Sequence, residues 1–546
     1  MHAVPAKRTP DYTVATKGSA AVLRLSAPAL ILACALFVPF LHKAYAIDDP
    51  YFLLETQQTR RQLLHPLDFN LCWFDSLHCA PAYKTAPGSA LMGYFLLPVL
   101  EFTASEPVIH LLELMVLFSA VIATVSLALR LGGTDFEARG AGMLLITFPP
   151  VLAMTNTVMP DVLVMALSVI GMERFIAWLD GGKIANIGAA VIALGLAPFG
   201  RPHAIGLIGV AAVAALLHGR KTGRAPVLVW KAMLPLGIAG ALFAGLTFLT
   251  HENGTAPALP PAFNLGWRNV IRNARALFSD YLICFPITAF WLVQMRRYVV
   301  WFIPGAGVIF GILHWAVGLS LGNATVWSLA GLSILCILHL LWQDVRFRSW
   351  NAMFVLWFLI PCAVLPYLHL APKHVMIAAP AAAIAAMGLL RREEAAFRLS
   401  VLAVAVAAFA IASLLILHAD ERFASLSRLA TAELVTPNVK KGERVWFAGQ
   451  WGVYWYALQA GATVVMPDVS EPAPGDLLLT EQFESPNPIL DRYPRRQLVG
   501  ERVFAWDGGR VMSSRNHAGL YTNILGPLPW SLGSGEVDRF QLWRID

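Results

Sequence analysis

Two adjacent carboxylates, Asp48 and Asp49, follow the first long apolar run of the chain, which spans residues 20–41. Tyr51 comes two residues later. Like charges this close repel each other, so one carboxyl group is expected to titrate high or to share a proton or a cation. A solvated turn would also accommodate an Asp-Pro sequence. At the end of a membrane helix, however, the pair predicts a general base at a membrane-surface active site.

Further acidic groups would complete such a site. Glu55 lies one to two helical turns after Asp48, close enough to extend the acidic patch if a helix begins there. Asp161 begins the fourth apolar segment, where it either complements the helix dipole or faces the same outer cavity as Asp48. Oxygen ligands of this kind could hold Mg²⁺ or Mn²⁺ at Asp48 and Asp49. Metal dependence therefore stays open, and no cofactor is certain.

Basic side chains lie on the same side of the membrane as these acids. The candidates for phosphate contact are Arg201, Arg268, Arg272, Arg275, Lys373 and His374. The three arginines between 268 and 275 recur at i, i+4 and i+7, so they share one helical face. Arginine forks suit phosphate oxygens, whereas a solvated or headgroup-binding face has the same spacing. Arg201, Lys373 and His374 lie at outer helix ends, where snorkelling to lipid headgroups is the simple explanation for their positive charge. The functional explanation is that they bind an anionic lipid-phosphate substrate.

The composition of the chain indicates what kind of protein carries these acidic and basic side chains. Of 546 residues, 57% are hydrophobic and 14% are charged, and the mean hydropathy is +0.61. We predict a polytopic α-helical membrane protein with about thirteen spanning helices. They are 20–42, 107–130, 139–157, 160–179, 184–200, 203–219, 227–250, 281–295, 298–320, 325–342, 350–369, 374–390 and 398–418. Most of the net charge of +7 lies in short loops between apolar runs, so it is not a nucleic-acid signature.

The segments divide the chain into three parts. A cytoplasmic tail covers 1–19, and a transmembrane domain covers 20–418, with outer loops at 43–107 and 251–280. A small extracytoplasmic α/β domain covers 419–546, where strand-like runs flank a helix-like one. The excess of Lys and Arg in the inner loops predicts that the N-terminus lies in the cytoplasm. We expect the protein to be located in the inner (plasma) membrane. Cys72 and Cys79 could form a local disulfide if their compartment is oxidising.

Three short motifs, in this order and on this side of the membrane, resemble those of the polytopic C-type (GT-C) glycosyltransferases. The resemblance is to the protein O-mannosyltransferase and aminoarabinose transferase branch (family 39). The motifs are the acidic pair with Tyr51, Met159-Pro160-Asp161-Val162, and Leu370-Ala-Pro-Lys373-His374-Val-Met-Ile-Ala-Ala-Pro380. The resemblance covers essentially the whole chain. Many relatives carry Asp-Glu at the first motif, a His-Pro-Pro segment before the second helix, and Arg-Tyr where this chain has Lys373-His374.

The resemblance implies a polyprenyl-phosphate-linked sugar donor and inversion at the anomeric carbon. The implied site residues are, for catalysis, Asp48, Asp49 and Asp161 and, for substrate binding, Tyr51, Glu55, Arg201, Arg268, Arg272, Lys373 and His374. Asp48 would be the general base, Asp49 would assist it, and Lys373 would stabilise the departing lipid phosphate. The acceptor would be a lipid, a glycan or a protein. The other expected partners are membrane lipids, without nucleic acid.

Two other function classes stay open. A lipid or solute transporter or flippase also carries polar groups in its helices, but usually at the membrane midplane and with inverted repeats. In this sequence the acids cluster at the outer face. A non-catalytic membrane assembly factor needs no outward-facing carboxylates and should tolerate replacement of Asp48. Glu113 and His110, in the outer half of the second helix, are further candidates because ionisable groups inside membrane helices are often functional.

Overall fold

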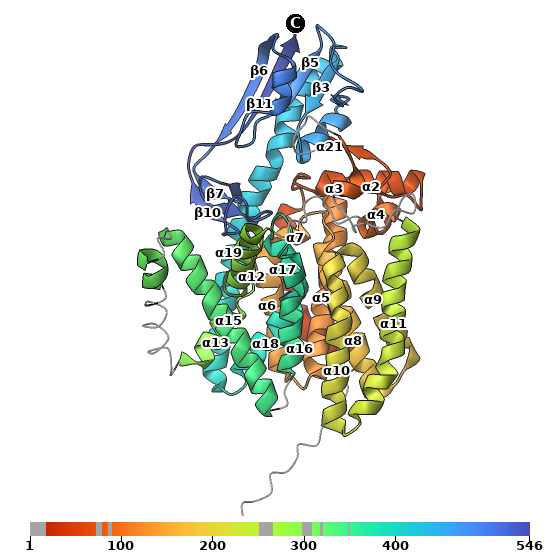
Figure 1. Ribbon diagram of the computed structural model, residues 1–546, viewed down its shortest axis with the longest axis vertical. Coiled ribbons are helices and arrows are strands. Elements are labelled where there is room, and N and C mark those ends of the chain that lie inside the picture. Colours follow the sequence, from red (N-terminus) through yellow and green to blue (C-terminus); the bar gives the residue numbers. More distant parts are fainter. Residues whose placement is uncertain are drawn as a thin grey trace, which may run out of the picture.

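Helices dominate the computed structural model, which describes residues 18–72, 79–85, 90–250, 266–296, 308, 310–316, 320–347 and 350–546 (Figure 1). Within these residues, eight helices are long and apolar enough to cross a membrane, or ten spans if two bent pairs are each counted as one. The eight are α1 with η1 (Ser19–Phe40), α5 (Glu106–Arg130), α8 (Asp161–Gly181), η2 with α10 (Pro202–Thr222), α11 (Ala225–Thr250), Asn323–Gln343 of α15 (Leu321–Phe347), α17 to α18 (Pro372–Leu390) and α19 (Ala395–Ala430) with its continuation. The protein is therefore a multi-pass membrane protein.

Two predicted segments belong to bent helix pairs. One pair is α6 (Asp135–Thr147) and α7 (Pro149–Thr155), at 63° to each other. The other is α12 (Trp267–Ile283) and α13 (Ile287–Gln294), at 59°. Phe148 has an extended ψ of 125° because the proline that follows it disfavours the helical conformation. A hydropathy profile averages over a window of about 19 residues, so it does not detect a bend inside such a segment.

The remaining predicted segments are shorter or fall outside the description. Residues 184–200 form α9 (Ile184–Gly200), and 350–369 form α16 (Asn351–Leu359) followed by η6 (Ile360–Val364). Both are apolar helices below the length of the eight. The predicted segment 298–320 lies largely outside the described residues, as does the first half of the loop 251–280.

The first loop places three short helices across one end of the bundle (Figure 1). They are α2 (Asp49–Arg61), α3 (Ala82–Thr85) and α4 (Leu91–Leu100). The apolar helix α4 is too short to span a membrane, and it packs against α2. Strands β1 (Asn70–Leu71) and β2 (Ala80–Pro81) pair antiparallel beside them. A disulfide between Cys72 and Cys79 closes this hairpin.

The C-terminal domain stands on α19. This helix does not end near residue 418 but continues to Ala430 and then through η8 (Thr431–Val435) into α20 (Thr436–Lys440). Above it is a five-stranded mixed sheet in the order β4-β3-β5-β11-β6. Its strands are β3 (Val445–Ala448), β4 (Thr463–Val464), β5 (Leu477–Glu481), β6 (Arg496–Ala505) and β11 (Glu536–Ile545). Helix α21 (Gly452–Gln459) connects β3 to β4, which confirms the predicted α/β pattern.

Smaller strands connect this sheet to the helices. Strand β7 (Gly508–Arg510) pairs with β10 (Ser531–Gly533), and this pair lies against α19 beside the end of the bundle (Figure 1). Strand β8 (Met512–Ser513) pairs with β9 (Ala518–Gly519). The chain between β9 and β10 therefore reaches from the C-terminal domain to the membrane helices.

Candidate active site

Four charged side chains meet at the end of the bundle that faces the C-terminal domain. Each lies within two residues of a proline: Asp48 (before Asp49-Pro50), Asp161 (after Pro160), Arg201 (before Pro202) and Lys373 (after Pro372). Proline fits the first turn of a helix and disfavours helix in the residue before it. Arg201 accordingly has extended backbone angles and ends α9. Prolines thus mark the helix ends at which these four charged side chains lie.

Two ion pairs join the four residues. Lys373 donates from Nζ to Asp48 Oδ2 at 2.7 Å, and Arg201 forms a two-pronged pair with Asp161 at 3.0 and 2.7 Å. The Lys373 side chain is 4% exposed and that of Asp48 is 32% exposed, so Asp48 is the member of its pair that a reactant can reach. The structure thus brings together four of the residues that the sequence singled out.

Electrostatics keep Asp48 ionised. Burial favours the neutral carboxyl, but the charge and hydrogen bond of Lys373 outweigh it, with a further contribution from Arg201. As a result, the pKa of Asp48 lies below its usual range. His369 stands beside the same charges, and burial together with Lys373 lowers its pKa to about 3. The imidazole is therefore neutral near pH 7 and could accept or donate a hydrogen bond.

Asp49 has a different environment from Asp48. It is fully buried, its Oδ2 accepts the Ala46 N–H at 2.9 Å, and its Oδ1 accepts the Val158 N–H at 2.7 Å. Burial raises its pKa to about 7 although nearby Lys43 opposes the shift. With both oxygens engaged, Asp49 ties the first loop to the turn that precedes α8.

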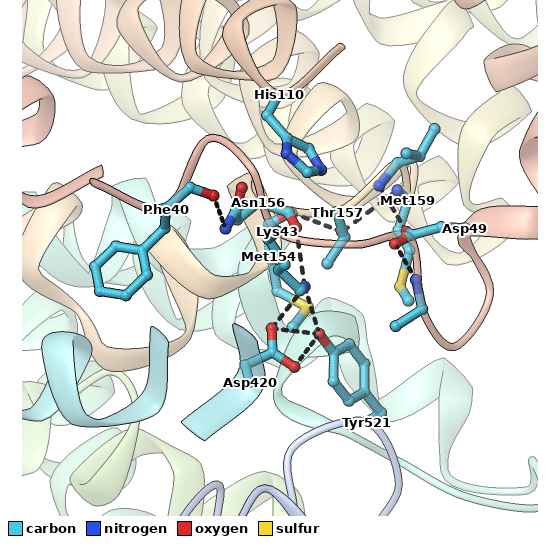
Figure 2. Close-up of polar contacts among 12 residues, drawn as sticks. Phe40, Lys43, Asp49, His110, Met154, Asn156, Thr157, Met159, Asp420 and Tyr521 are labelled. Atoms are coloured by element: carbon cyan, nitrogen blue, oxygen red, sulfur yellow. Dashed lines mark hydrogen bonds and ion pairs between the residues drawn. The ribbon is translucent and has the colours of Figure 1, made fainter. Parts of the chain in front are cut away.

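Beneath this loop lies a buried ion pair that sequence reasoning missed. Lys43 Nζ is 2.6 Å from Asp420 Oδ2 of α19, and both side chains are fully buried. Lys43 also donates to the Asn156 carbonyl at 2.9 Å and to the Tyr521 hydroxyl at 3.2 Å. Figure 2 shows Lys43, Asp420 and Tyr521 pointing toward one another. The sequence signals were a lysine directly after a membrane segment and an aspartate in a long apolar helix.

The other predicted residues of the first loop and of α17 lie in packed surroundings. Tyr51 is buried and its hydroxyl donates to the Ala82 carbonyl at 3.4 Å. Glu55 is buried and its Oε1 accepts the Gly93 N–H at 2.7 Å, so the carboxyl group contacts α4. His374 accepts the Ala371 N–H at 3.0 Å and thereby caps α17. These contacts support the backbone around Asp48 and Lys373.

The predicted arginine face does form on α12. Arg268 is exposed, Arg272 donates to the Leu368 carbonyl, and Arg275 donates to Asn323. Arg272 thus contacts the loop that leads to Lys373, and its charge reaches His369. Of the three arginines, Arg272 therefore adds positive charge beside His369.

Two buried groups lie deeper, in α5. Both carboxyl oxygens of Glu113 lack a hydrogen-bond partner among the residues that the structure describes, and so does His110 Nε2. His110 Nδ1 lies 3.0 Å from the Leu41 carbonyl. The two side chains therefore form no hydrogen bond with each other.

The described residues hold no group of three or more His, Cys, Asp or Glu side chains that could bind a metal ion. Asp49 has both oxygens bonded to backbone N–H groups and Asp48 is paired with Lys373. These two residues thus do not present a vacant set of oxygen ligands. The arrangement instead supplies one reachable carboxylate beside fixed positive charges, which suits proton abstraction next to an anion.

No protein-family model and no curated protein sequence matches this chain. Among solved structures, that of ArnT from Cupriavidus metallidurans bound to undecaprenyl phosphate is similar over 89% of this chain and 97% of that chain, at 14% identity and a TM-score of 0.51. The chain has the GT-C fold. The structure of the Archaeoglobus fulgidus oligosaccharyltransferase with Zn and sulfate aligns with 88% of this chain and 72% of that chain, at 9% identity and a TM-score of 0.45.

This fold agrees with the fold class that the sequence predicted. At this level of identity the likeness concerns the arrangement of the helices and the C-terminal domain. The roles of individual side chains must be argued from their own geometry.

Proposed function

We propose that this protein is an integral-membrane glycosyltransferase that moves a sugar from a polyprenyl-phosphate donor to an acceptor at the outer face of the inner (plasma) membrane. The observation that carries the proposal is the reachable Asp48 carboxylate held against Lys373 at the end of a GT-C bundle. The N-terminus would lie in the cytoplasm and the C-terminal domain outside. The presence of undecaprenyl phosphate in the ArnT structure supports the choice of donor.

In this reaction Asp48 acts as the general base. The acceptor hydroxyl or phosphate gives its proton to Asp48 and its oxygen attacks the anomeric carbon, while the bond from that carbon to the lipid phosphate breaks. Attack opposite to the leaving phosphate inverts the anomeric configuration. The departing phosphate carries the bonding electrons, and the Lys373 ammonium stabilises the charge that develops on it.

The Asp48–Lys373 pair also couples phosphate binding to basicity. The charge and hydrogen bond of Lys373 lower the pKa of Asp48, which makes Asp48 a weak base. A phosphate next to Lys373 shares its positive charge, so the pKa of Asp48 rises toward the working pH, where a general base is most effective. Arg201 and Arg272 would bring further charge, and Asp161 fixes the orientation of Arg201.

The test is transfer of radiolabelled sugar from a panel of polyprenyl-phosphate sugars in membranes. Asp48→Asn should lower transfer by about 10²–10⁴-fold, the usual contribution of a general base. Asp68→Asn is a matched control, because Asp68 is an exposed aspartate of the same loop. The anomeric configuration of the product, measured by NMR, tests inversion.

The same experiment separates the alternatives. Wild-type protein that releases sugar from no donor, together with an Asp48→Asn variant that still functions in cells, would contradict the proposal. That result would favour a transporter or an assembly factor.

A further inference from the structure

A short segment of the C-terminal domain, Leu520–Asn523, is inserted among the membrane helices, and we call it the brace segment. Leu520, Tyr521 and Asn523 are all buried. The chain around it is tightly folded, because a Cβ atom added at Gly519 would lie 2.2 Å from the Thr522 carbonyl oxygen. Such a close approach leaves the segment little freedom to rearrange.

The first contact of the brace segment is Tyr521. Its hydroxyl lies 2.9 and 2.8 Å from the two oxygens of Asp420, to which it donates, and it accepts from Lys43 at 3.2 Å. Lys43 lies five residues before Asp48 in the chain. Lys43 also holds the carbonyl of Asn156, next to the turn that Asp49 binds. Tyr521 therefore completes the contacts of Lys43 (Figure 2), and these contacts support the backbone that leads to Asp48.

The second contact is Asn523. Its Oδ1 accepts the Leu370 N–H at 3.1 Å, and its Nδ2 donates to Asn273 Oδ1 at 2.9 Å. Asn273 in turn donates to the carbonyls of Leu365 and Tyr367 at 3.0 and 2.8 Å. These bonds fix the loop that ends three residues before Lys373. One four-residue segment thus supports the backbone on both sides of the Asp48–Lys373 ion pair.

From this geometry we propose that Tyr521 and Asn523 are positioning residues, through which the C-terminal domain sets the distance between Asp48 and Lys373 during transfer. The inference rests on the proposed function. A buried ion pair such as Lys43–Asp420 is a poor source of stability, since removing two charges from water costs as much as their attraction returns. Its value here is the fixed geometry that it imposes on the loop before Asp48.

Kinetics of full-length variants provide the first test. Tyr521→Phe and Asn523→Leu should each lower kcat for sugar transfer about 10- to 100-fold while KM for the donor stays within about twofold, because small displacements of catalytic groups act on the transition state. Tyr493→Phe is the matched control, since the Tyr493 hydroxyl bonds to Glu471 within the C-terminal domain. A kcat equal to that of the control in both variants would overturn the proposal.

Hydrogen exchange in lipid nanodiscs provides a readout that does not depend on activity. Asn523→Leu should speed exchange of amides in 366–373, and Tyr521→Phe should do so in 43–49, with Tyr493→Phe changing neither. Unchanged exchange in both segments would also overturn the brace. If the wild-type protein transfers no sugar from any donor, the proposed function fails, whereas the exchange result still decides whether the brace exists.

Discussion

Three carboxyl groups within eight residues of the first loop have three different roles because their partners differ. Asp48 pairs with a cation and stays reachable, Asp49 binds two backbone N–H groups, and Glu55 has one hydrogen bond in an apolar contact. The chemistry of each group follows from what it touches. The same residue type in one short stretch therefore does not imply a shared function.

The Asp48–Lys373 pair makes a pH dependence predictable. Lys373→Met removes the charge that lowers the pKa of Asp48, so burial should then raise that pKa. The acid limb of the pH profile of kcat/KM should move to higher pH in Lys373→Met and stay in place in Lys373→Arg, which keeps the charge. Coincident acid limbs in the two variants would contradict this account.

The Asp48–Lys373 ion pair should also make the stability of the fold depend on pH. Because the pKa of Asp48 is lower in the folded protein than in the unfolded chain, where it is about 3.9, the pair stabilises the fold above that pH. This contribution is lost as the pH falls through the folded-state pKa. The melting temperature of the wild-type protein should therefore drop more steeply on acidification than that of Lys373→Met.

Glu55 should show the opposite pH dependence. Burial raises its pKa well above the usual range, so the folded protein keeps a proton that the unfolded chain, with a pKa of about 4.3, has lost. Stability linked to Glu55 therefore falls as the pH rises. Glu55→Gln should gain melting temperature relative to wild type between pH 5 and pH 8. A difference that is the same at both pH values would argue against a neutral Glu55.

Sequence reasoning at this scale found Asp48, Asp161, Arg201 and Lys373 because each is a charged residue at the outer end of an apolar segment. It did not find that Lys373 contacts Asp48, since 325 residues separate them. Lys43, Tyr521 and Asn523 were missed for the same reason. Their partners are distant in the chain, and nothing local distinguishes them from ordinary polar residues.

At the scale of elements, the contact between α2 and α4 holds the first loop in place. A Cβ atom at Gly93 of α4 would lie 2.4 Å from Thr59 Oγ1 and 2.8 Å from Glu55 Oε1, both on α2. Hydropathy predicted each apolar helix, because burial in lipid requires long apolar runs. It could not predict the bends at α6–α7 and α12–α13 or the length of α19, which depend on packing and on the C-terminal domain.

Gly93→Ala should separate these two helices. We expect a loss of about 1–3 kcal/mol of stability, as for other overpacked sites, and a lower melting temperature. Gly188→Ala in α9 is the matched control, because no atom lies within 4 Å of its added Cβ and alanine favours helix by about 1 kcal/mol. Equal melting temperatures for the two variants would show that α4 moves freely against α2.

At the scale of the whole molecule, a second set of contacts joins the C-terminal domain to the bundle. The Tyr456 hydroxyl of α21 donates to Glu106 Oε1 at 2.9 Å and accepts the Tyr45 N–H at 2.8 Å. Arg428 of α19 lies 3.3 Å from the same carboxylate. The interface therefore contacts the first loop at Tyr45, three residues before Asp48.

Tyr456→Phe should weaken this interface. It leaves the Tyr45 N–H without an acceptor, and an unsatisfied buried donor costs about 1–3 kcal/mol. Thermal unfolding of the purified protein measures the loss, with Tyr493→Phe as the comparison within the same domain. A variant that melts with the control would mean that the domains are held together elsewhere.

The contact between Lys43 and Tyr521 joins residues 478 positions apart, and this separation has a consequence for biosynthesis. Lys43 leaves the ribosome 478 residues before Tyr521, whose hydroxyl completes the set of contacts that Lys43 makes. Until Tyr521 is synthesised, the Lys43 ammonium group lacks one of its hydrogen-bond partners in a buried environment. Such a chain should be slow to mature, since distant contacts form late, and a version truncated before residue 520 should be degraded rather than accumulate.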